Sequence, residues 1–183
     1  MFVNKTHQQF PIRAAALLSV LAIVSCSSTG GGGAGPLHQM GERIQVGALN
    51  YIVLESEWVN DLPGAAGPRV PENKFLLVRA TITNSGNREI SIPLLTVIDD
   101  KGNEVMESSE GQGVEEWLGI LRTIKPAETL SGRILFDAKP LNYKLRVSDG
   151  GEPDREITRL VTIPLKLKEY EKFEPGTGKK ELD

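Results

Sequence analysis

Apolar and polar residues alternate with a period of two along most of the chain between residues 42 and 165, which is typical of half-buried β-strands. The clearest strand is expected at 75–83, and the apolar residues on one of its faces are Leu76, Val78, Ala80 and Ile82. Similar short segments occur at 44–48, 51–58, 90–92, 95–98, 105–106, 130–136, 143–147 and 157–165. This series of about seven to nine strands, without a long helical period, predicts an all-β fold, a two-sheet antiparallel β-sandwich.

The connections between these segments carry their own signals. Residues that tolerate unusual backbone angles mark turns at 84–87, 99–103 and 149–151. The Pro- and Gly-rich segment 60–71 is expected to be an irregular loop. Segment 108–125 leaves two alternatives open, a loop or a short helix, because its apolar residues have helical spacing. These residues are Val114, Trp117, Leu118 and Leu121.

The N-terminus has the architecture of a bacterial lipoprotein signal. Lys5 and Arg13 precede an apolar run at 14–24, which is too short for a permanent membrane span. Cys26 follows, and the lipobox residues before it are Ile23, Val24 and Ser25. We expect cleavage before Cys26 and lipidation of its thiol, since two or more acyl chains anchor a protein stably in a membrane.

This signal sets the predicted domain boundaries. Residues 1–25 form the signal peptide, 26–41 the lipidated cysteine with a Gly/Ser-rich tether, and 42–165 the sandwich. Residues 166–183 form a charged tail that we expect to be disordered. Ser27 follows the cysteine where an aspartate would resemble an inner-membrane retention signal, so the outer membrane or cell surface is the expected location.

Composition excludes several classes of function. The chain of 183 residues has one cysteine, which excludes an internal disulfide and a cysteine-cluster metal site. Its formal net charge of −3 gives no basic surface for a nucleic acid. Of its two histidines only His38 follows the signal, in the tether, so histidine-based catalysis and a cofactor are not expected.

Several segments together resemble the telokin-like, immunoglobulin-fold domains of bacterial secreted proteins and lipoproteins. The resemblance covers roughly residues 43–148, and its segments are 73–86, 98–102, 124–128, 132–137 and 143–147. It implies an immunoglobulin-like β-sandwich outside the cytosol, and it implies no established activity. The loop 60–71 and the acidic stretch 108–116 depart from the family pattern, so an individual function is expected there.

Carboxylates offer the main candidate chemistry. A metal-dependent or carboxylate-based hydrolase using the loop acids from Glu104 to Glu116 is the alternative function, and it needs two acids facing each other across a cleft. Asp99 and Asp100 are expected to cap their turn through hydrogen bonds to backbone amides. A calcium site at the same turn is the other reading, with Asn103 and Glu104 as further oxygen ligands.

Aromatic residues point to a binding surface. We expect one of the two tryptophans, Trp58 and Trp117, in the core and Trp117 as the exposed anchor for a partner. Phe75 and Leu77 would lie on the outer sheet face as a second contact patch. The favoured function is therefore a non-catalytic module, lipid-anchored at the cell envelope, that binds another envelope protein or a polymer.

Overall fold

The computed structural model describes residues 36–152 and 154–166, which form β-strands and connections but no helix. None of these described residues belongs to a helix that could cross a membrane. The strands are β1 (Leu37–His38), β2 (Arg43–Val46), β3 (Leu49–Val59), β4 (Phe75–Asn84), β5 (Ile90–Ile92), β6 (Thr96–Asp99), β7 (Glu104–Met106), β8 (Arg122–Ile124), β9 (Thr129–Asp137), β10 (Tyr143–Ser148) and β11 (Thr158–Ile163).

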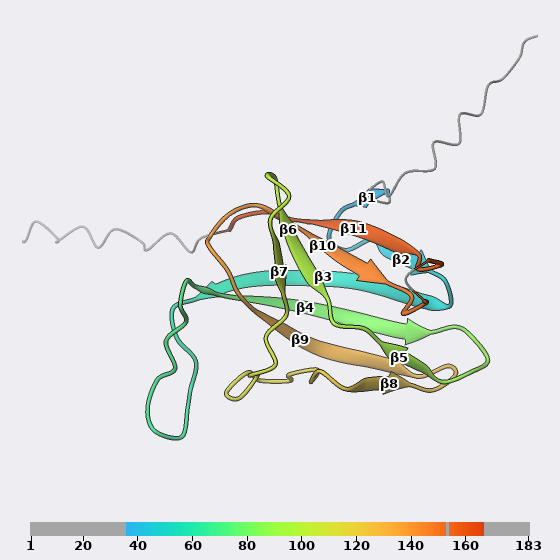
Figure 1. The fold of residues 1–183 in the computed structure, drawn as a ribbon. Helices are drawn as coiled ribbons and strands as arrows, with labels where there is room; N and C mark the ends of the chain where they lie inside the picture. Colours follow the sequence, from blue (N-terminus) through green and yellow to red (C-terminus); the bar gives the residue numbers. More distant parts are fainter. Residues whose placement is uncertain (1–35, 153, 167–183) are drawn as a thin grey trace, which may run out of the picture. The chain divides into compact units, whose positions relative to one another are not determined.

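The strands form two main sheets and a small third one (Figure 1). The first sheet has the order β1-β11-β10-β6-β7, the second β2-β3-β4-β9, and β5 pairs only with β8. All pairings are antiparallel except that of β1 with β11. The orders β3-β4-β9 and β11-β10-β6 match those of strands A-B-E and G-F-C in an immunoglobulin domain, so the predicted sandwich is confirmed.

One apolar core lies between the two main sheets. Leu76, Val78, Ala80 and Ile82 are all at most 1% exposed, as their alternation predicts. Trp58 belongs to this core, and its ring centroid lies 6.3 Å from that of Tyr143. Tyr143 begins β10 and donates a 3.0 Å hydrogen bond to the carbonyl of Lys139, the tyrosine corner that immunoglobulin sandwiches place at this strand.

The sandwich begins earlier than the sequence indicates. Leu37 and His38, assigned to the tether, form β1 and pair with Leu160 and Val161 of β11. Two residues are too few to show a hydrophobic period, and their strand forms because it covers the otherwise open edge of β11. The predicted boundary at residue 42 therefore misses the first strand.

The segment between β7 and β8 is a loop, so the helical alternative is wrong. Its apolar residues do not share one buried face, since Leu121 is 95% exposed whereas Val114 packs against a cluster on the outer sheet face. Glu116 and Gly119 also have positive φ angles, of 52° and 71°, which a right-handed helix does not allow.

Candidate functional site: a tryptophan cleft between two loops

The two loops that depart from the family pattern touch each other. The loop after β3 is closed by the pairing of Leu62 with Arg69. The Arg69 guanidinium donates a 2.5 Å hydrogen bond to the carbonyl of Gln112, in the loop after β7. Gly113 lies against the Pro63 carbonyl so closely that a Cβ would overlap with it. These contacts bring residues about 50 positions apart in the chain into one surface.

A second apolar cluster supports both loops on the outer face of the β2-β3-β4-β9 sheet. Its buried members are Leu62, Phe75, Leu77 and Leu135, with Val59 and Val114 packed against them. Phe75 is only 4% exposed, and the Arg69 guanidinium lies 5.5 Å from its ring centroid. The expected outer-face position of Phe75 and Leu77 is therefore correct, but the loops cover them. Phe75 supports the loops and offers no exposed contact patch.

Trp117 lines a cleft of about 320 Å³ over these loops. The other lining residues are Arg69, Ser109, Glu110, Gly111 and Gln112. Trp117 is half-buried, and its indole lies on Gly111, where any Cβ would overlap with the ring. An aromatic surface flanked by polar side chains can contact a ligand group that has both apolar and polar atoms.

A buried ion pair closes the base of the 107–122 loop. The Arg122 guanidinium lies 2.9 Å from the Glu107 carboxylate, and both side chains are 1% exposed. Glu107 also accepts a 2.8 Å hydrogen bond from the amide of Leu95, while Arg122 donates one of 3.0 Å to the carbonyl of Pro93. The sequence shows only that two charges flank an uncertain segment, so this pair could not be found from it.

The same loop adds to the free edge of β9. The amide of Leu118 donates to the carbonyl of Arg133 at 3.0 Å, and the amide of Arg133 donates to the carbonyl of Glu116 at 2.8 Å. The amide of Ser108 donates to the carbonyl of Leu135 at 2.7 Å. The loop thus protects a sheet edge that could otherwise pair with another chain, and it fixes the backbone on both sides of Trp117.

The acidic residues of this loop neutralise arginines rather than face one another. Arg79 and Arg133 are cross-strand neighbours on β4 and β9, an arrangement that is unfavourable for like charges. Glu116 lies 3.1 Å from Arg79, and Glu115 lies 3.2 Å from Arg133. The charges of Glu115 and Glu116 thus offset the repulsion between Arg79 and Arg133.

Glu104 is likewise engaged with an arginine. Its two carboxylate oxygens accept hydrogen bonds of 2.8 and 2.7 Å from Arg146 on β10, and these bonds hold the pKa of Glu104 below its ordinary value. Among the described residues, no three metal-ligating side chains gather in one place. Glu104, Glu115 and Glu116 each contact an arginine, and Glu110 is the one acid among the residues that line the tryptophan cleft.

The 99–103 turn uses its carboxylate for capping. One oxygen of Asp99 accepts 2.8 Å hydrogen bonds from the amides of Lys101 and Asn103, and the other accepts one of 2.7 Å from the Asn103 side chain. The Asn103 side-chain bond is the main reason that the pKa of Asp99 lies below its ordinary value. Capping by Asp99 is confirmed, whereas Asp100 contacts Lys144 at 3.2 Å. The four residues of the alternative calcium site therefore do not converge.

The predicted lipidation site lies outside the described residues. Cys26 and the lipobox residues Ile23, Val24 and Ser25 are not described, nor is the charged tail beyond Lys166. Their roles stay predictions from the sequence.

Comparisons with known proteins agree with the fold. Residues 38–151 match the family described as a domain of unknown function, DUF4352. No curated protein matches the chain. The yjhA protein from Bacillus subtilis is a similar solved structure, with 18% identity, a TM-score of 0.52, and coverage of 69% of this chain and 98% of that one. A functionally unknown protein from Listeria monocytogenes has 12% identity, a TM-score of 0.51, and coverage of 68% and 82%.

Proposed function

The chain belongs to the DUF4352 family of domains of unknown function, and from this premise we propose that it is a non-catalytic binding module, lipid-anchored at the cell envelope. The module contacts another envelope protein or a polymer through the cleft that Trp117 lines. Its anchor is the lipidated Cys26, and its location is extracytoplasmic.

The observation that carries this proposal is the fixed position of Trp117. The indole lies on a glycine, in a loop whose base is an ion pair with side chains 1% exposed and whose backbone is paired with β9. Tryptophan is enriched among residues that dominate binding energies, and a site that is already ordered loses less entropy on binding. A loop that served only as a connection would need neither the closed base nor the second apolar cluster beneath it.

The absence of catalysis is part of the proposal, and it is supported by how the acids are used. Glu104, Glu107, Glu115 and Glu116 each contact a different arginine. Carboxylate-based hydrolysis needs a pair of acids positioned on either side of one bond. Their separate pairing favours a structural role for each acid.

Photo-crosslinking in intact cells tests the binding role. A photoreactive amino acid replaces Gln112, which lines the cleft, and in the matched control it replaces Lys101, an exposed residue of the β6–β7 turn. We expect a discrete crosslinked species from position 112 and none from position 101. No species from position 112, or the same species from both positions, would contradict the proposal.

A further inference from the structure

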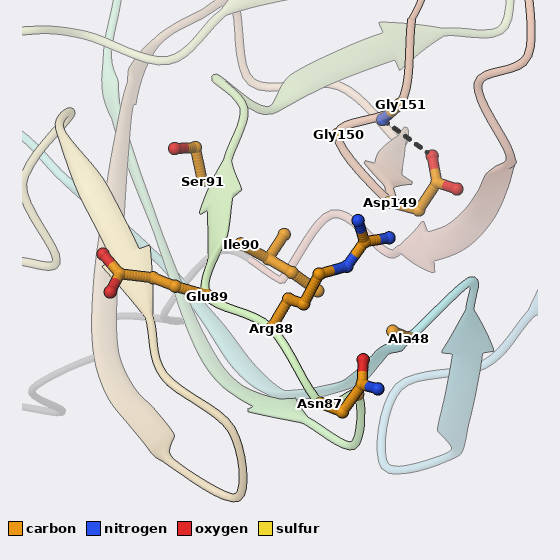
Figure 2. A pocket seen from close by; sticks show the side chains of 10 residues that line it. Ala48, Asn87, Arg88, Glu89, Ile90, Ser91, Asp149, Gly150 and Gly151 are labelled. Carbon is orange, nitrogen blue, oxygen red and sulfur yellow. Dashed lines mark hydrogen bonds between the residues drawn. The ribbon is translucent and has the colours of Figure 1, made fainter.

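A second hollow, of about 430 Å³, lies apart from the tryptophan cleft, where β4 and β10 end (Figure 2). Its lining comes from three connections: Ala48 between β2 and β3, residues 86–91 from the turn after β4 into β5, and residues 149–151 after β10. In terms of the immunoglobulin fold, the last two are the B–C and F–G connections. These connections lie at the end of the sandwich that variable domains use for recognition.

One wall of this hollow is held by Asn84, whose side chain is fully buried. Its side-chain oxygen accepts a 2.8 Å hydrogen bond from the amide of Gly86. Its side-chain nitrogen donates to the carbonyls of Arg88 and Ile124, at 2.7 and 2.9 Å. The turn that carries Arg88 is therefore tied to β8 at its base, and its backbone is already ordered before any ligand arrives.

The opposite wall is the turn after β10. The amide of Gly151 donates a 3.1 Å hydrogen bond to Asp149, drawn as the dashed line in Figure 2, and the same carboxylate oxygen accepts one of 3.0 Å from Ile157. Gly150 has a φ of +70°, and a Cβ there would lie 2.7 Å from the carbonyl of Ser91. The turn after β10 thus packs closely against the backbone of Ser91 in β5, and this packing requires glycine at position 150.

Arg88 is the one cation among the residues that line the hollow, and the carboxylates of Glu89 and Asp149 line it as well. Figure 2 shows its guanidinium extending toward the turn formed by Asp149 and the two glycines, whereas Glu89 extends the other way. No hydrogen bond or ion pair of the Arg88 side chain occurs within residues 36–152 and 154–166. The arginines that do contact a carboxylate are Arg69, Arg79, Arg122, Arg133, Arg146 and Arg155.

We propose that this hollow binds a small ligand through an oxyanion, a carboxylate or a phosphate group, with Arg88 as its counter-charge. The planar guanidinium can donate two parallel hydrogen bonds to either group. Asn87 and Ser91, which also line the hollow, add an amide and a hydroxyl. No aromatic side chain lines it, so the charged group and not a stacked ring is what the site recognises.

Titration of the full chain with two separate probes, inorganic phosphate and succinate, tests this inference. The backbone amide NMR shifts of Gly86, Gly150 and Gly151 are followed at fixed pH and ionic strength. We expect saturable shifts with at least one probe, and at least about tenfold weaker binding in Arg88→Gln. The probe that produces the shifts identifies the group, and shifts with both identify the shared oxyanion chemistry.

Arg43→Gln is the matched control, because it removes the same charge from an exposed arginine outside the hollow. It is expected to bind like the wild type, and both variants are expected to melt like the wild type, since both arginines are exposed. Shifts that do not saturate with either probe would overturn the inference, and so would equal binding by R88Q and R43Q. Because Arg88 does not line the tryptophan cleft, this result is independent of the crosslinking from position 112.

Discussion

At the scale of single residues, the charges of Glu107 and Arg122 are more important to the fold than any exposed ion pair. Both side chains are 1% exposed, and Arg122 keeps two nitrogens, Nε and Nη1, without a hydrogen-bond partner among the described residues. The attraction between the two groups must therefore offset the cost of removing both from water. Removing one partner leaves the other charge buried and uncompensated.

We predict that Glu107→Gln lowers the free energy of unfolding by about 3–5 kcal/mol, the cost typical of breaking a buried ion pair. The double variant Glu107→Leu with Arg122→Met is expected to be more stable than E107Q, because it removes both charges. Urea denaturation measures both. Glu104→Gln, which removes an exposed ion pair with Arg146, is the control and should change stability little. A double variant less stable than E107Q would contradict this reading.

Trp117 is the residue on which the proposed binding role depends. It belongs to neither apolar cluster, so Trp117→Ala is expected to shift the melting temperature by only about 3 °C or less. The crosslinked species captured from position 112 should decrease sharply in the same variant. A large fall in melting temperature would instead show that the indole contributes to the packing of the core.

Gly111→Ala tests the cleft by a second route. The added Cβ would overlap with the indole, so we predict that the ring moves away and that its fluorescence maximum shifts. Trp58 lies in the core and contributes a constant background to the emission. An unchanged spectrum together with unchanged crosslinking would show that the indole does not lie on Gly111.

At the scale of elements, the 99–103 turn makes stability depend on pH. Hydrogen bonds to the ionised carboxylate, chiefly from Asn103, place the pKa of folded Asp99 below its ordinary 3.8. In the unfolded chain the carboxylate takes up its proton first on acidification. The stabilisation is therefore complete above about pH 5 and is lost as the pH falls through the ordinary pKa toward the folded one.

We predict that wild-type protein loses more stability between about pH 5 and pH 2.5 than Asp99→Asn does, as measured by urea denaturation at each pH. Asn103→Ala removes the main hydrogen bond to the carboxylate and should flatten the dependence in the same direction. Parallel profiles for the wild type and both variants would refute the assignment to this turn.

Strand formation was predictable from the sequence where the two faces of a strand meet different surroundings. In β4, the side chains of Val78 and Ala80 lie in the core, whereas Arg79 on the other face contacts an exposed acid. The alternation of apolar and polar residues in the sequence follows from this difference between the two faces. β1 was not predictable, because two residues have no period and their pairing depends on a strand more than 120 positions later. Long-range contacts of this kind leave no local pattern.

The same contrast between local patterns and long-range contacts applies to the candidate sites. Trp117 could be selected from the sequence because a tryptophan beside acidic residues in a segment without a strand pattern is uncommon. Its supports could not be predicted, since Gly111, Glu107 and Arg122 acquire their roles only when the loop closes on itself. The Arg88 hollow was also missed, because its walls come from three turns that the sequence places far apart.

At the scale of the whole molecule, the proposed lipid anchor at Cys26 precedes the sandwich in the chain. β1 begins at Leu37, so the segment between Cys26 and the first strand comprises residues 27–36 and is shorter than the predicted tether. In the proposed function acyl chains on Cys26 provide the attachment, because the chain has a negative formal net charge and anionic lipids would repel it.

Mass spectrometry of the native protein purified from the membrane fraction tests whether Cys26 is the lipidated N-terminus. We expect a mature chain that begins at Cys26 and carries acyl chains on that residue, with the first 25 residues removed. An intact, unmodified chain that begins at Met1 would contradict it.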